Sequence, residues 1–264
     1  MDSWTKEELH KAYFHNPTNI REKINSLPGA KIDIYLKSLK FSYQLLCDSI
    51  DSLIRTTTVF RCEAQKSSIY DSGKSKLFKD LEFSIQKDIF AYSTWIYAIE
   101  NYCRVNRIPN TPDKTKEDIK KKRLATFDHN EKYLFLRALR RSITHLPSIY
   151  LPHWQISWSK NGKQIKFVFD SNRLSKTRDR NDNIKSHEIL LSFIHQNPII
   201  DTEELCKQFH SSIKKFYHWL IVQIENNSPS ELNEYYKYIR WLSHFNKKAF
   251  INVVRKTKKR KNKS

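Results

Sequence analysis

The sequence predicts a mainly α-helical bundle that carries one antiparallel β-hairpin, at about residues 153–170, inserted between helices. Glycine is rare, with three residues in 264, whereas Lys, Glu, Leu and Ile are common, and this composition favours helices. Apolar residues recur every three to four positions along most of the chain, which is the spacing of one helix face. We expect a single helical domain over residues 1–254 and a basic disordered tail over residues 255–264.

The first third of the chain predicts two short helices and then a long one. Residues 6–14 and a second short segment after Pro17 have helical character, and Pro28-Gly29 is expected to stop the second segment. Helical spacing then continues over about residues 32–59. Its apolar positions are Leu36, Leu39, Tyr43, Leu46, Ile50 and Leu53.

The most regular apolar stripe follows, and it predicts a buried helix that begins near Phe78. Arg104 and Arg107 are expected in its last turns, where cations interact favourably with the helix dipole. Pro109 and Pro112 should end it. The stripe consists of Phe78, Leu81, Ile85, Ile89, Tyr92, Ile96 and Ile99. Residues 110–123 are highly charged and predict a loop, with at most a helical turn at residues 117–123.

The period changes to two on either side of Asn161-Gly162. Trp154, Ile156 and Trp158 alternate with polar residues, and Ile165, Phe167 and Phe169 do the same. Asn-Gly between two alternating runs predicts a β-hairpin, because a type I′ turn needs positive φ at both central residues. The regular alternation favours core packing of Trp154 and Trp158 over base stacking.

Two cap signals mark the last helices. Asp201 with Glu204 three residues later predicts a capping box before a long apolar stripe. Ser228-Pro229 opens the final helix in a similar way, because proline suits the first turn.

Composition excludes several functions. The chain has no glycine-rich phosphate loop, which argues against Walker-type NTPases and dinucleotide enzymes. The four cysteines form no C-x-x-C pair, and no signal peptide or run of about 18 apolar residues is visible. We therefore expect reduced core thiols in a cytoplasmic protein without a cofactor or metal. A zinc site from scattered Cys and His is the weaker alternative.

The charge indicates a polyanionic partner. The formal net charge is +20, and it remains +13 without the tail. Nucleic acid is the first candidate, an anionic membrane the second, and a solubility effect the alternative to both. The tail should contact phosphates without reading sequence. Its cations are Arg255, Lys256, Lys258, Lys259, Arg260, Lys261 and Lys263.

One segment combines features of a chemical site: residues 131–152, EKYLFLRALRRSITHLPSIYLP. It predicts an amphipathic helix with a basic stripe made of Arg137, Arg140 and Arg141. Pro147 disfavours an α conformation before it, so the helix should end at about His145. A histidine there lies among unpaired carbonyls, which favour its charged form, and arginines one turn back could bind a phosphate.

The spacing of Arg140 and His145 suggests a site shared by two subunits. Five residues at about 100° each place the two side chains roughly 140° apart on one helix. Two such helices meeting across a symmetric interface could each supply side chains to one cleft. The structural alternative is that His145 caps the helix and the arginines form a solvated face.

These residues resemble the HEPN domains, which are all-α dimeric modules. The family signature is an Arg, then four to six residues, then a His. One uncharacterised bacterial group has an L-R-N-x-x-x-H-x-x-L-P segment, and it is similar to LRALRRSITHLPSIYLP in this chain. Arg141 stands where that family generally has Asn. The segment IENYCRV, with Arg104, is similar to the family's preceding helix. A later helix also fits, through Asp201, Phe216, Tyr217, Trp219 and Leu220.

The resemblance implies a metal-independent endoribonuclease that acts as a toxin or antiviral effector and has an inhibitory or sensor partner. His145 would be general base or acid, and Arg140, with Arg137 and Arg141, would bind the scissile phosphate of RNA. A homodimer would complete the site. The alternative is a catalytically inactive HEPN-like dimer that binds nucleic acid or a protein.

Other residues are weaker candidates. The pairs Arg123–His129 and Arg180–His187 also have the Arg-to-His spacing. His210 and His218 are interpreted as satisfied surface or rim histidines rather than ligands.

Overall fold

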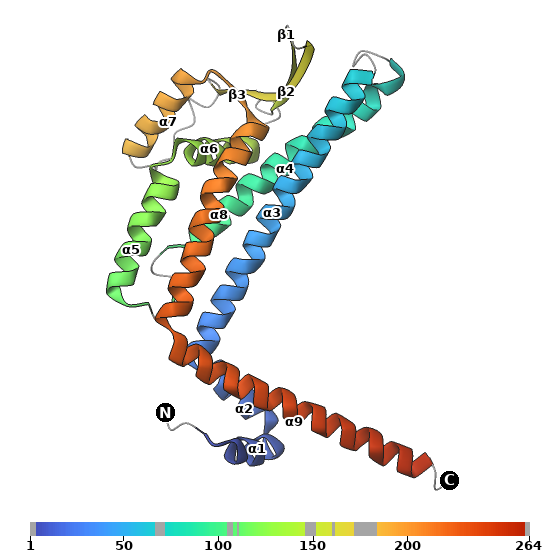
Figure 1. The fold of residues 1–264 in the computed structure, drawn as a ribbon, viewed down its shortest axis with the longest axis vertical. Coiled ribbons are helices and arrows are strands. Elements are labelled where there is room, and N and C mark those ends of the chain that lie inside the picture. The colour runs from blue at the N-terminus through green and yellow to red at the C-terminus, as the bar shows by residue number, and fades with distance from the viewer. Residues whose placement is uncertain are drawn as a thin grey trace. The chain divides into compact units, whose positions relative to one another are not determined.

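The computed structural model is mainly helical, with a small three-stranded antiparallel sheet (Figure 1). It describes residues 4–66, 72–104, 108–109, 111–145, 152–159, 162–171 and 184–261. The chain forms two compact units where the sequence predicted one domain. The first comprises Met1–Ser38, Ile108–Pro112 and Ile221–Ser264, and the second comprises Leu39–Arg107 and Asp113–Leu220. A continuous apolar stripe does not reveal which partner covers each part, so this division was not apparent from sequence.

The first unit contains α1 (Lys6–His15), α2 (Pro17–Asn25), the beginning of α3 (Pro28–Lys66) and α9 (Pro229–Lys261). Thr5 and Glu8 form a reciprocal capping box that starts α1, and Asn16 accepts a hydrogen bond from the Asn19 N–H to start α2. The core combines apolar side chains of all four helices. Its members are Leu9, Tyr13, Ile20, Ile24, Leu27, Ala30, Tyr235, Tyr238, Leu242 and Phe245.

Pro28-Gly29 begins the long helix, whereas the sequence analysis expected it to stop the preceding one. Proline suits the first turn because its missing N–H would have no partner there. A Cβ on Gly29 would lie 2.1 Å from the Glu231 carbonyl oxygen and 2.7 Å from the Tyr235 Cβ. Glycine is therefore required because the backbones of α3 and α9 approach closely at this point.

The second unit contains the rest of α3, then η1 (Ser72–Lys74), α4 (Ser75–Tyr102), α5 (Asp113–Arg123) and the π-helical turn η3 (Leu124–Asp128). It continues with α6 (Glu131–His145), α7 (Ile184–Gln196) and most of α8 (Thr202–Asn227). The predicted stripe of α4 is confirmed, because all its members except the half-buried Leu81 are buried. This helix ends at Tyr102, so Arg104 follows it rather than lying in its last turn; Arg107 is outside the described residues.

Residues 113–123 form the helix α5, and the prediction of a loop over residues 110–123 was wrong for this part. Lys and Glu are good helix formers, so high charge alone does not indicate a loop. Thr115 and Ile119 are buried, four residues apart on one face. Two buried positions in a charged segment were too weak a pattern to recognise.

The predicted hairpin is confirmed as β1 (His153–Ser159) and β2 (Gly162–Asp170). The register pairs Ser159 with Gly162, so Gly162 belongs to the strand rather than to the turn centre. Residues 160–161 lie outside the described residues.

A third strand, β3 (Ile199–Asp201), pairs antiparallel with β2 and was not predicted. Three residues are too few to show an alternating pattern.

The C-terminal segment continues α9 as far as Lys261, in place of the disordered tail expected from residue 255. Lys and Arg extend an existing helix at little cost, since nucleation has already occurred upstream. Residues 262–264 lie outside the described residues. In the described part of the chain, no helix combines the length and the apolar character needed to cross a membrane.

Candidate functional site

The helix that carries the predicted site is built as the sequence indicated. The Asn130 side-chain oxygen accepts hydrogen bonds from the N–H groups of Lys132, at 3.0 Å, and Tyr133, at 3.3 Å, and so starts α6. The helix ends at His145. Its buried face packs in the core of the second unit, and it consists of Tyr133, Leu134, Phe135, Leu136, Ala138 and Leu139.

The three arginines of α6 are partly buried rather than fully solvated. The Arg140 guanidinium carbon lies 4.2 Å from the centre of the Tyr97 ring, which α4 supplies. The Arg137 guanidinium carbon lies 5.8 Å from the ring centre of Tyr133, one turn earlier on α6. Cation–π contacts of this kind contribute about 0.5–2 kcal/mol, more where water is excluded. Tyr97 therefore orients Arg140 before any ligand binds.

A buried phenol, Tyr133, lies against Arg137, and the buried Glu100 carboxylate is near this phenol. Tyr133 is 1% exposed, and its hydroxyl has no hydrogen-bond partner among the described residues. Burial, followed by the nearby Glu100 carboxylate, raises the pKa of Tyr133 far above its ordinary value, while Arg137 acts in the opposite direction. Tyr133 is thus a neutral phenol at every physiological pH, and it shapes the wall behind Arg137 without titrating.

The alternative pair Arg123–His129 is structural. Arg123 donates to Glu100 Oε1 at 2.6 Å and to Asp128 Oδ2 at 2.8 Å, and its side chain is 16% exposed. Glu100 also lies 3.6 Å from Arg104. An arginine that already neutralises two carboxylates offers little to a phosphate. Arg180 of the other pair lies outside the described residues.

Arg140 and His145 lie on one uninterrupted helix, and this limits what a single chain can do. The helix includes His145, so the offset of about 140° around the axis applies, with a rise of about 7.5 Å between the two positions. The His145 side chain lies outside the described residues. The structure therefore brings Arg137 and Arg140 against tyrosines, but it does not bring Arg140 and His145 to one point within one chain.

The remaining predicted positions divide between core and surface. Trp154 is half-buried with its ring centre 6.3 Å from that of Phe60, which confirms core packing; the Trp158 side chain is outside the described residues. His218 is exposed. His210 is half-buried beside Tyr43 and Tyr92, which agrees with the predicted rim position, although its Nδ1 has no hydrogen-bond partner among the described residues.

The tail cations and the cysteines are placed as follows. Six of the seven tail cations belong to α9: Arg255, Lys256, Lys258, Lys259, Arg260 and Lys261. The seventh, Lys263, and the side chains of all seven lie outside the described residues. Cys103 and Cys206 are buried, Cys47 is half-buried and Cys62 is exposed, so only some of the thiols belong to the core. Within the described ranges, no group of three His, Cys, Asp or Glu side chains could hold a metal ion.

Sequence reasoning did not identify Tyr97, Tyr133 or Glu100 as parts of this site. Tyr97 and Glu100 lie three residues apart at the edge of the apolar stripe of α4, next to positions whose only visible role is packing. Their proximity to α6 results from helix packing and leaves no local pattern. Tyr133 fits the apolar face of α6, which conceals its polar atom.

Comparison of the chain with protein-family models, with curated proteins and with solved structures gives no match.

Proposed function

We propose that the protein is a HEPN-like, metal-independent endoribonuclease whose active site is completed by a second copy of the chain. The observation that carries the proposal is the placement of Arg140: it is partly buried, oriented by Tyr97 at 4.2 Å, and located in the last turns of the helix that ends at His145. A preoriented guanidinium loses less freedom when it binds a phosphate, and its fork matches two phosphate oxygens.

The reaction follows from the chemistry of these two side chains. His145 removes the proton from a ribose 2′-hydroxyl, and the 2′-oxygen attacks the adjacent phosphorus. Arg140, with Arg137 and Arg141 beside it, stabilises the charge that develops on the phosphorane. The P–O5′ bond then breaks, and the 5′-oxygen takes a proton from the histidine of the second copy. The products are a 2′,3′-cyclic phosphate and a 5′-hydroxyl.

Two copies are needed because α6 is continuous. Arg140 and His145 diverge by about 140° around the axis, so one helix cannot direct both at one phosphate. A two-fold interface along the half-buried side of α6 that carries the arginines would bring the arginine of one copy to the histidine of the other. In cells, the activity fits a toxin or antiviral effector held in check by a protein partner.

The test is cleavage of single-stranded RNA in the presence of EDTA. We expect Arg140→Ala and His145→Ala each to lower the rate by about 10²–10³-fold, the range for loss of one preorganised charge donor. The matched controls are Arg55→Ala and His195→Ala, which change exposed residues of α3 and α7 and should leave the rate unchanged. Detection of the 2′,3′-cyclic phosphate identifies the chemistry. Equal rates for wild type and both site variants would refute the proposal.

Mixing the two inactive variants tests whether the site is shared. A mixed dimer pairs the intact Arg140 of one copy with the intact His145 of the other but lacks the second histidine, so we expect activity to return in part, to less than about one quarter of the wild-type level. If both residues act within one chain, mixing restores nothing.

A second candidate is a non-catalytic HEPN-like dimer that binds nucleic acid. The observation that favours it is the same divergence of Arg140 and His145 on one helix, together with the formal charge of +20. It predicts salt-sensitive RNA binding without cleavage, and unchanged affinity in His145→Ala.

A further inference from the structure

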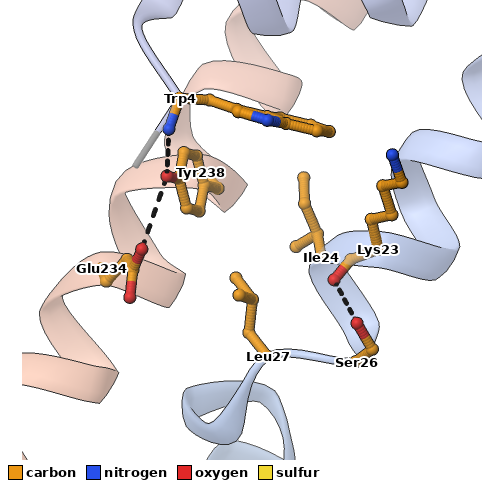
Figure 2. Close-up of a pocket in the computed structure, with 7 residues that line it drawn as sticks. All are labelled: Trp4, Lys23, Ile24, Ser26, Leu27, Glu234 and Tyr238. Atoms are coloured by element: carbon orange, nitrogen blue, oxygen red, sulfur yellow. Dashed lines mark hydrogen bonds between the residues drawn. The ribbon is translucent and has the colours of Figure 1, made fainter. Parts of the chain in front are cut away.

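The first unit contains a pocket of about 330 Å³, which is large enough for a small ligand (Figure 2). It lies between the N-terminal segment, α2 and α9. None of its residues belongs to the site on α6. The lining consists of Trp4, Lys23, Ile24, Ser26, Leu27, Glu234 and Tyr238.

The walls of the pocket are aromatic and apolar, and they are built rigidly. The Trp4 indole forms one side, Leu27 lies opposite, and Ile24 and Tyr238 lie between them (Figure 2). Ile24 and Tyr238 are 2% and 4% exposed. The backbone N–H of Trp4 donates to the Tyr238 hydroxyl at 3.0 Å, and this bond holds the Trp4 backbone against α9 beside the pocket. Such a space suits a flat ring that stacks on the indole.

Two opposite charges flank this apolar space. Lys23 on α2 and Glu234 on α9 approach from opposite sides (Figure 2). The Lys23 Nζ lies 5.4 Å from the centre of the Trp4 ring. The Glu234 Oε1 accepts a hydrogen bond from the Tyr238 hydroxyl at 3.4 Å, which leaves most of its acceptor capacity for another donor. Burial raises the pKa of Tyr238, so this hydroxyl stays protonated and can donate.

These charges restrict the class of ligand. A cation stacked on Trp4 would meet Lys23 on the same ring, which disfavours an ammonium ligand. A purely apolar ligand would exclude water from the Glu234 carboxylate and offer it no donor beyond the Tyr238 hydroxyl, and this is costly. The pocket instead matches a flat ring with hydrogen-bond donors at one end and an anion at the other.

We propose that this pocket binds a guanine nucleotide, with the base stacked on Trp4, its donor edge on Glu234 and its phosphate at Lys23. Guanine presents two neighbouring donors, N1–H and the 2-amino group, and an ionised carboxylate accepts both through its two oxygens. Adenine places an acceptor beside its amino group, and uracil places a carbonyl on each side of its single donor. Both arrangements set an acceptor against the carboxylate of Glu234.

The test is titration calorimetry of the full chain with GMP, AMP, UMP, guanosine and inorganic phosphate. We expect GMP to bind at least about tenfold more tightly than AMP or UMP, because one bidentate pair discriminates by roughly that factor or more. Trp4→Ala should weaken GMP binding about fivefold or more through loss of stacking, whereas Trp4→Phe should retain part of it.

The two charged residues have separate predicted effects. Lys23→Ala should remove the advantage of GMP over guanosine, and the matched control Lys31→Ala, an exposed lysine of α3 in the same unit, should preserve it. Glu234→Gln should abolish the preference for GMP over AMP and UMP without abolishing binding. Circular dichroism melts of all variants show whether the fold is retained.

Two RNA pentamers, with and without a single guanine, distinguish a free nucleotide from a residue of RNA as the natural source. Tighter binding of the guanine pentamer, lost in Trp4→Ala, identifies RNA; binding of GMP alone identifies a free nucleotide. The proposal is overturned if GMP does not bind, if GMP and UMP bind equally, or if Lys23→Ala and Lys31→Ala have the same effect in folded protein.

Discussion

At the scale of single residues, His210 is a half-buried side chain with one ring nitrogen that lacks a hydrogen-bond partner among the described residues. Its ring lies 6.3 Å from that of Tyr43 and 6.1 Å from that of Tyr92, and its Nδ1 has no partner among the described residues. Burial lowers the pKa of His210; Asp51 opposes this shift and Lys214 adds to it. The neutral imidazole is therefore favoured in the folded protein.

This lowered pKa predicts a pH-dependent stability. The unfolded chain binds a proton to His210 more readily than the folded chain does. The contribution of His210 to the free energy of unfolding is therefore complete above about pH 6.5, and it is lost as the pH falls toward the pKa of this residue in the folded state. We expect the free energy of unfolding to fall less between pH 7.5 and 5.5 in His210→Phe than in the wild type, as measured by urea denaturation.

The matched control is His195→Phe, which changes an exposed histidine of α7 in the same unit. It should keep the wild-type pH dependence. An equal flattening of the pH dependence by both variants would show that the burial of His210 is not the cause.

At the scale of elements, one ion-pair network joins α4, α5 and η3. Arg123 ends α5 and bonds both to Glu100 of α4 and to Asp128 of η3. Glu100 is 3% exposed. Removal of one partner from a buried pair leaves the other charge uncompensated, which costs more than the pair itself contributes.

We expect Arg123→Ala to lower the free energy of unfolding by about 3 kcal/mol, the lower end of the range for a broken buried pair, because Arg104 still lies near Glu100. Urea denaturation measures this change. Lys120→Ala, on the exposed side of α5, should shift stability by less than about 0.5 kcal/mol. The double variant Arg123→Met with Glu100→Leu should recover much of the loss; no recovery would show that packing rather than charge dominates.

At the scale of the whole molecule, the dominant property is charge. The formal excess of 20 positive charges includes seven basic residues after residue 254, six of which lie on α9. A helix presents these cations at a fixed spacing, and binding to RNA would release counterions in proportion to the phosphates neutralised.

Deletion of residues 255–264 should weaken RNA binding and reduce its salt dependence. For a single strand, the slope of log K against log salt changes by about 0.7 for each lost phosphate contact. Fluorescence anisotropy with labelled RNA at several KCl concentrations measures both quantities, and the thermal melt should be unchanged. An unaltered slope would show that the last residues do not contact RNA.

Much of the secondary structure could be predicted from sequence, and the reason differs between elements. The stripe of α4 and the alternation around Asn161-Gly162 are strong because many residues repeat one period. The end of α6 at His145 follows from Pro147, which acts through the neighbouring backbone. In contrast, α5 and β3 each bury only one or two residues, so their patterns are too weak to distinguish from loops.

The candidate site was predictable only in part. Arg137, Arg140 and Arg141 stand out because they gather on one helix near a terminal histidine. Tyr97, which contacts Arg140, lies on another helix about forty residues earlier, and nothing in either segment encodes the contact. The same holds for the pocket around Trp4, whose walls come from both ends of the chain.

The sequence by itself determined where most helices run, the hairpin, the basic character and the helix that ends at His145, because these depend on local periods, caps and composition. Only the tertiary structure decided that the chain forms two units, that Arg123 pairs with Glu100 and Asp128 while Arg140 lies against Tyr97, and that Trp4, Lys23 and Glu234 line a pocket. The physical reason is that long-range packing pairs residues by shape and charge, and these pairings leave no periodic trace in the chain.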